Sequence, residues 1–126
     1  MSKTVEFYFD FGSPATFLAY TQISKIAERT GAELIWKPML LGGVFKATGN
    51  SSPVLIPAKA KWMNRDLARW AKRYGTKIGF PAGFPLNTLP LMRGAVGYKR
   101  EGEDVFLRYV DMIFKAIWQN EVDVRD

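Results

Sequence analysis

The chain has 126 residues, 48% of them hydrophobic and 14% aromatic, which is enough apolar material for one globular domain. It contains no cysteine and no histidine, so disulfide exchange, thiolate nucleophiles, imidazole catalysis and zinc sites built on these residues are excluded. No apolar run reaches the roughly 18 residues that span a bilayer, and the net charge of +6 favours anionic partners. Because the chain begins with a strand-like segment instead of a signal peptide, we expect a soluble, cytoplasmic protein.

The first third of the chain predicts a strand, a helix and a second strand. Residues 4–10 (TVEFYFD) alternate apolar with mostly polar side chains, which is the period of a strand. Ser13 and Pro14 suit the N-cap and first position of a helix over residues 14–30. Residues 32–38 (AELIWKP) predict the second strand. A βαβ unit this short implies a right-handed crossover between parallel strands.

The rest of the chain predicts a long loop and three helices. Residues 39–57 contain several Gly, Ser and Pro residues that break regular structure, so we expect a loop, and a loop of this length is usually functional or disordered. Apolar residues at helical spacing predict one helix that ends before Gly75, a shorter one to about residue 100 and a last one over about 104–120.

Two parallel strands make a poor sheet, because parallel strands need cover on both faces. We therefore expect the chain to be the front part of a longer polypeptide or to rely on a partner, and an isolated chain to self-associate through its sheet. The strand residues expected to supply this uncovered apolar surface are Val5, Phe7, Phe9, Leu34 and Trp36.

Three segments carry a resemblance to a known family. They are residues 8–14 (YFDFGSP), residues 38–50 (PMLLGGVFKATGN), and Lys59 followed by residues 66–71 (DLARWA). In this order and spacing they resemble the 2-hydroxychromene-2-carboxylate isomerases and the related kappa-class glutathione transferases, which are DsbA-like members of the thioredoxin superfamily. The resemblance covers essentially the whole chain.

The resemblance implies an α/β fold in which a thioredoxin-like domain is interrupted by a helical insertion. It assigns residues 1–56 to the N-terminal half of the thioredoxin-like domain, with the active-site loop, and residues 57–126 to the insertion domain. The C-terminal half, with its antiparallel strands and the cis-proline loop that holds glutathione, has no counterpart before Asp126.

Ser13 is the candidate catalytic residue. In thioredoxin-like disulfide oxidoreductases a Cys-x-x-Cys pair opens the first helix, whereas residues 13–16 of this chain are SPAT, which excludes redox work. The free N–H groups at a helix N-terminus favour an anion such as a thiolate. The resemblance implies that Ser13 donates a hydrogen bond to the sulfur of glutathione and lowers its pKa. On its own Ser13 is an N-cap, and a hydroxyl can serve both roles because it accepts and donates.

The resemblance also assigns Asn50 and Lys59 to the binding of glutathione and Lys46 to the carboxylate of an aromatic acid substrate. Taken alone, Asn50 suits a left-handed loop position, and the two lysines suit ordinary solvated cations. No residue is assigned to a metal.

Three further features are expected to be structural. Trp70 belongs to the apolar pattern of its helix and is expected in the core. The basic residues between Lys61 and Arg73 are expected to face solvent, since no nucleic-acid motif accompanies them. Asp10 is expected to form local hydrogen bonds and is given no catalytic role.

The function that the resemblance implies is a glutathione-dependent isomerisation of 2-hydroxychromene-2-carboxylate-type aromatic acids in naphthalene-like catabolism, by a homodimer without nucleic-acid or membrane partners. One alternative is a kappa-class-like glutathione S-transferase. Another is a non-catalytic binding module, if the chain is truncated. A basic nucleic-acid binder is a third, which salt-dependent retention on DNA would reveal.

Overall fold

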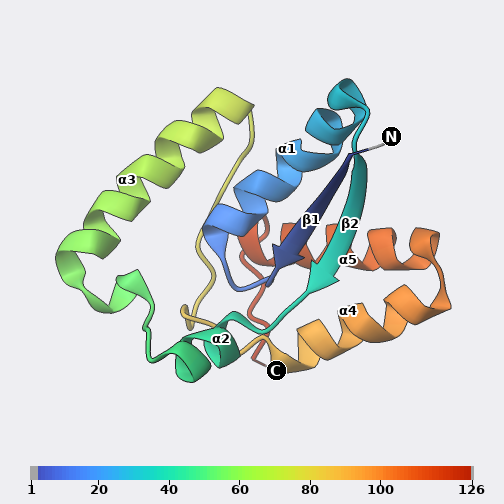
Figure 1. Ribbon diagram of the computed structural model, residues 1–126. Coiled ribbons are helices and arrows are strands. Elements are labelled where there is room, and N and C mark those ends of the chain that lie inside the picture. The colour runs from blue at the N-terminus through green and yellow to red at the C-terminus, as the bar shows by residue number, and fades with distance from the viewer. Residues whose placement is uncertain (1–2, 126) are drawn as a thin grey trace.

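The computed structural model describes residues 3–125, which form two strands, five α-helices and one short 3₁₀ helix (Figure 1). In chain order the elements are β1 (Thr4–Phe9), α1 (Pro14–Thr30), β2 (Glu33–Pro38), α2 (Leu41–Thr48), η1 (Pro53–Leu55), α3 (Pro57–Tyr74), α4 (Leu89–Glu101) and α5 (Glu103–Trp118). Both predicted strands and all four predicted helices are confirmed. None of the described helices is long and apolar enough to cross a membrane.

The loop predicted for residues 39–57 is wrong over part of its length, because this segment contains α2 and η1. The two glycines inside α2, Gly42 and Gly43, lower its helix propensity and conceal it in the sequence. A contact from outside the segment compensates: the backbone N–H of Leu41 at the start of α2 donates a hydrogen bond to the Asp10 carboxylate at 2.8 Å. Gly49 ends the helix in the left-handed conformation, with φ 71°.

The two strands pair in parallel, and α1 connects them (Figure 1). Phe7 lies opposite Trp36 in the register, so both side chains belong to the same face of the sheet. Two helices cover this face. The centroid of the Trp36 ring lies 5.9 Å from that of Tyr20 in α1 and 6.0 Å from that of Phe106 in α5.

The apolar surface predicted to remain uncovered is therefore mostly covered within the chain. Phe9 is 0% exposed and Trp36 is 7% exposed, so the prediction is wrong for these two residues. It holds for Val5, which is 37% exposed, and Tyr8 on the opposite face is 55% exposed. Self-association through the sheet stays a prediction.

The core is an aromatic cluster where α5 packs against the sheet and the turn after β1. Phe11 packs edge-on against Phe114 with ring centroids 4.8 Å apart, and the indole N–H of Trp118 donates to the Phe11 carbonyl at 2.7 Å. The core thus contains residues from both sides of the predicted boundary between residues 56 and 57. That boundary stays a prediction, but the two parts pack around one core.

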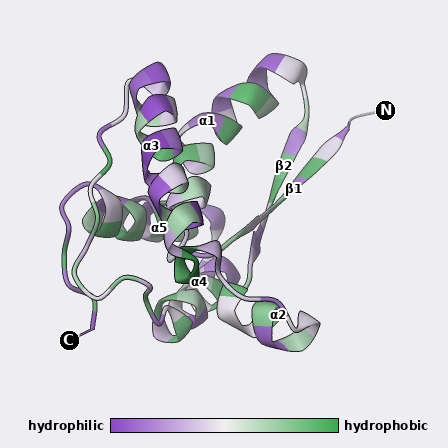
Figure 2. Cartoon of the chain, turned by 90° about the vertical axis from the view of Figure 1, so that its left-hand side faces the viewer, coloured by the Kyte–Doolittle hydropathy of each residue, from purple (hydrophilic) through white to green (hydrophobic). Residues whose placement is uncertain are grey.

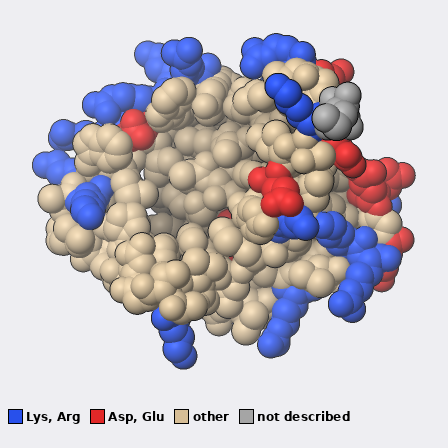
Figure 3. Space-filling view, viewed as in Figure 1, with Lys and Arg blue, Asp and Glu red and all other residues tan. Residues whose placement is uncertain are grey.

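Helix α3 packs against α1, and many of its residues are hydrophilic (Figure 2). It carries much of the positive charge of the chain (Figure 3). The basic residues between Lys61 and Arg73 are exposed, as predicted, and Lys59 is exposed as well. Trp70 was expected in the core, but it is 43% exposed. Its ring packs against that of Tyr74, and the Arg73 guanidinium carbon lies 5.7 Å from its centroid. This prediction is wrong because Leu67 and Ala71 form the buried side of α3 instead.

Asp111 provides a test of the packing between α1 and α5. Its carboxylate accepts a hydrogen bond from the Tyr20 hydroxyl at 2.6 Å and pairs with Lys115 at 2.8 Å. Burial acts to raise the pKa of Asp111, but the hydrogen bonds from Lys115 and Tyr20 outweigh it and hold the pKa below its ordinary value of 3.8. The stabilisation is therefore present above about pH 4 and is lost as the pH falls through the lowered pKa.

We expect Asp111→Asn to lower the free energy of unfolding at pH 7 by about 1 kcal/mol, because the ion pair is largely exposed. Urea unfolding followed by circular dichroism from pH 7 to pH 2 measures the difference from the wild type, which should shrink as the wild-type carboxylate becomes protonated. Glu33→Gln, which changes an exposed carboxylate, is the control. A difference that stays constant down to pH 2 would contradict the assigned role.

Candidate functional site

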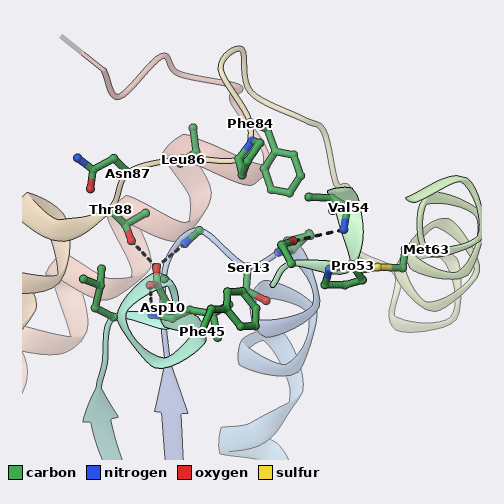
Figure 4. A pocket seen from close by; sticks show the side chains of 17 residues that line it. Asp10, Ser13, Phe45, Pro53, Val54, Met63, Phe84, Leu86, Asn87 and Thr88 are labelled. Atoms are coloured by element: carbon green, nitrogen blue, oxygen red, sulfur yellow. Dashed lines mark hydrogen bonds between the residues drawn. The ribbon is translucent and has the colours of Figure 1, made fainter. Parts of the chain in front are cut away.

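A cavity of about 430 Å³ lies beyond the C-terminal ends of β1 and β2 (Figure 4). This is the place where α/β folds usually bind ligands. The lining residues are Asp10, Gly12, Ser13, Pro14, Leu40, Leu41, Gly42, Phe45, Ser52, Pro53, Val54, Met63, Phe84, Pro85, Leu86, Asn87 and Thr88. They come from the turn before α1, from α2, η1 and α3, and from the segment that leads into α4.

Helices α1, α2 and α4 all begin at this cavity. Pro14 and Leu41 are the first residues of α1 and α2, Thr88 is the N-cap of α4, and all three line the cavity. The N-terminal end of a helix carries a partial positive charge and N–H groups without a helical partner. These ends favour negative charge at the cavity, and the Asp10 carboxylate, which is hydrogen-bonded to Leu41 and Thr88, already supplies one such charge.

Ser13 is the N-cap of α1, as predicted from the sequence, and it lines the cavity. Its Oγ accepts the backbone N–H of Thr16 at 3.1 Å. Within the described residues 3–125, the Ser13 hydroxyl donates no hydrogen bond and the backbone N–H of Ala15 has no partner. Both groups can therefore donate to a ligand. Figure 4 shows Ser13 in the same cavity as Phe45 and Phe84.

Asp10 forms the hydrogen bonds expected of it, but they reach farther along the chain than expected. The side chain is 3% exposed. Its Oδ1 accepts the backbone N–H of Gly12 at 2.9 Å and the hydroxyl of Thr88 at 2.6 Å. Its Oδ2 accepts the backbone N–H of Leu41 at 2.8 Å. Both oxygens are acceptors in these bonds, which suits a carboxylate that is fully satisfied.

The other three predicted site residues are exposed and lie outside the cavity lining. Lys46 follows the lining residue Phe45 on α2, and Lys59 precedes the lining residue Met63 by one turn of α3. The Asn50 side chain accepts the backbone N–H of Ser51 at 2.8 Å. The structure thus places Ser13 in the cavity and the other three within a few residues of lining positions along the chain.

Sequence reasoning missed the apolar walls of the cavity and the part played by Thr88. The walls are formed mainly by Leu40, Phe45, Val54, Met63, Phe84 and Leu86. Several of these residues lie in segments that the sequence marks as irregular, where no periodic pattern indicates a face. Nothing in the local sequence indicates that the Thr88 hydroxyl binds Asp10, which is 78 residues away.

The chemistry available here is that of a hydroxyl, backbone N–H groups and an apolar surface. Among residues 3–125 there is no group of three or more His, Cys, Asp or Glu that could hold a metal ion. The arrangement can bind an anionic atom at Ser13 beside an apolar group against the walls.

Comparison with known proteins identifies the family. Residues 4–126 match the family model of the DSBA-like thioredoxin domain. The chain belongs to this family. The thioredoxin-like α/β fold and the resemblance seen in the sequence are both confirmed.

The similar proteins are isomerases and glutathione transferases. The chain is 36% identical over 129 residues to a 2-hydroxychromene-2-carboxylate isomerase of Sphingobium xenophagum, an alignment that covers 100% of this chain and 64% of that protein. It is 34% identical to the enzyme of the same name from Pseudomonas putida, with 90% of this chain and 55% of that protein covered. It is 26% identical to human glutathione S-transferase kappa 1, with 100% and 58% covered.

The chain is also similar in three dimensions to a solved isomerase structure. The structure of a selenomethionine-labelled 2-hydroxychromene-2-carboxylate isomerase matches with a TM-score of 0.81 at 32% identity, over 94% of this chain and 58% of that chain. This chain thus spans less than two thirds of the length of each of these proteins.

Proposed function

We propose that the chain carries the active site of a glutathione-dependent isomerase that acts on 2-hydroxychromene-2-carboxylate-type aromatic acids. The observation that carries this proposal is the position of Ser13, which lines an apolar cavity at the N-terminus of α1 and keeps its hydroxyl proton free within the described residues. The names of the relatives at 34% and 36% identity support the isomerase. We further propose a cytoplasmic homodimer that serves aromatic hydrocarbon catabolism.

Glutathione, when bound, supplies a thiol that becomes a nucleophile once it is ionised. The residues at the start of α1 fit such a group. The Ser13 hydroxyl and the Ala15 N–H donate to an anionic sulfur, and the positive end of α1 favours its charge, so together they lower the pKa of a bound thiol. The walls beside this position are mainly apolar, and electrostatic interactions are stronger in such surroundings than in water.

The remaining assignments concern groups outside the cavity. We propose that Asn50 and Lys59 hold the peptide part of glutathione and that Lys46 binds the substrate carboxylate. Their exposure suits contacts with polar, solvated parts of a ligand. The aromatic part of the substrate lies against the walls that include Phe45 and Phe84.

A kappa-class-like glutathione transferase is the second candidate, favoured by the similarity to kappa 1 proteins at 26% and 27% identity. The same serine and cavity would serve it. Turnover of a hydroxychromene carboxylate supports the isomerase, whereas conjugation of a chlorinated aromatic supports the transferase. Glutathione affinity without either activity would support a non-catalytic binding module.

The first test of the proposal is Ser13→Ala. We expect this change to raise the pKa of the bound glutathione thiol, because it removes a donor to the thiolate, and to lower isomerase activity at least tenfold. Stability should fall by only about 1 kcal/mol, since the lost hydroxyl also caps α1. Ultraviolet absorbance of the thiolate across pH measures the ionisation directly.

Ser52→Ala is the matched control for this test. Ser52 also lines the cavity and also caps a helix, since its Oγ accepts the Val54 N–H at 3.3 Å, but that helix has three residues. The shift in the thiol pKa should therefore be clearly smaller than for Ser13→Ala. Equal titration curves for Ser13→Ala and the wild type would leave Ser13 as a cap alone.

The second test separates a site from a diffuse charge effect. Lys59 and Lys72 are exposed lysines on α3, but Lys59 lies one turn from the cavity residue Met63. We expect Lys59→Met to weaken glutathione binding several-fold and Lys72→Met to leave it within twofold of the wild type. Isothermal titration calorimetry of both variants measures the affinities. Equal losses would show that only the overall charge of α3 matters.

A further inference from the structure

We propose that Asp10 is a positioning residue for the reaction proposed above. Its buried carboxylate joins the starts of α1, α2 and α4 and so sets the spacing between Ser13 and the apolar walls that hold the substrate. This inference rests on the proposed function, but the structural part of it can be measured without any turnover.

The three hydrogen bonds of Asp10 connect three separate parts of the chain. Leu41 lies 31 residues away and begins α2, whereas Thr88 lies 78 residues away and is the N-cap of α4. Gly12 is the residue before Ser13. Figure 4 shows these bonds meeting at the Asp10 carboxylate.

Two of the residues that are hydrogen-bonded to Asp10, Leu41 and Thr88, adjoin segments that form walls of the cavity. Leu41 leads into the α2 residues that line one side, among them Phe45. Thr88 ends the segment that lines another side, among them Phe84 and Leu86. Because Asp10 holds both walls and the turn at Ser13, a shift at any one of its bonds changes the distance between Ser13 and a wall.

The residues that surround the Asp10 carboxylate are closely packed. Thr88 is 2% exposed. A Cβ atom added to Gly12 would lie 3.1 Å from the Thr88 methyl carbon and 3.4 Å from Asp10 Oδ1, so the turn already lies close to both. In addition, the backbone N–H of Phe11 donates to the Met92 sulfur at 3.5 Å, which ties the same turn to α4.

The same geometry argues against a catalytic role for Asp10 itself. Both carboxylate oxygens already accept hydrogen bonds from the protein, and the side chain is almost completely buried. It forms no ion pair within residues 3–125, so backbone N–H groups, one hydroxyl and the helix N-termini balance its charge. An asparagine cannot replace it, because its amide NH₂ would face the N–H of Gly12 or Leu41.

The test uses two variants at the carboxylate network and one control. Thr88→Val keeps the shape of the side chain and removes one hydrogen bond without changing any charge. Asp10→Asn removes the bond to Leu41 or to Gly12. Asp111→Asn changes a hydrogen-bonded carboxylate on α5 that does not line the cavity.

We expect Thr88→Val to raise the KM for the aromatic acid about tenfold with a smaller fall in kcat, because misplaced walls weaken substrate positioning. Asp10→Asn should have the larger effect, and Thr88→Ser, which keeps the donor, should stay nearer to the wild type than Thr88→Val. Asp111→Asn should lower the melting temperature and leave KM unchanged. All assays are run at a temperature where circular dichroism shows every variant folded.

Amide hydrogen exchange provides a readout that needs no activity. In Asp10→Asn the amide of Leu41 or Gly12 should exchange at least tenfold faster relative to the amides of α3, whereas Asp111→Asn should not change this ratio. If wild-type protein turns over no substrate with glutathione, the proposed function fails and the exchange rates alone decide whether Asp10 holds the walls. Unchanged exchange ratios, or a KM that follows only the melting temperature in all variants, would overturn the proposal.

Discussion

A pair of parallel strands cannot bury its apolar face with only the helix that connects them, so the sheet of this chain depends on α5. Phe106 and Phe114 of α5 lie with ring centroids 6.2 Å and 6.0 Å from Phe9, the last residue of β1. Together with α1, this helix covers the face that carries Trp36. Burial of such large aromatic side chains supplies much of the driving force for folding.

The same packing fixes the turn that carries the candidate site. The Phe11 ring packs in the core against Phe114, while its carbonyl accepts the indole N–H of Trp118 at 2.7 Å. Asp10 and Ser13 lie on either side of Phe11 in the chain, so the buried position of Phe11 restricts the movement of both residues. The turn that carries Ser13 is therefore as rigid as the core residue within it. Such rigidity suits a side chain that must bind a ligand at hydrogen-bond distance.

Local patterns were sufficient for most of the fold, because the strands and the longer helices carry apolar residues at their own period. They failed for α2, whose Gly42 and Gly43 oppose a helix and whose first N–H is bound by a residue 31 positions earlier. Ser13 could be predicted because a cap is a local feature. The pairing of Asp10 with Thr88 could not, since 78 residues separate them.

The cavity is lined by a carboxylate, whereas exposed lysines lie outside it. This arrangement determines the orientation of a ligand that has both an anionic and an apolar part. A carboxylate deep in the cavity would approach Asp10, and like charges repel more strongly in apolar surroundings than in water. At the surface the same carboxylate meets exposed cations such as Lys46 and Lys59. If the proposed substrate class is correct, an aromatic acid would therefore bind with its ring inward and its carboxylate outward. Under the proposed function, the anion that the interior accepts is a sulfur at Ser13, where the N-terminus of α1 offsets its charge.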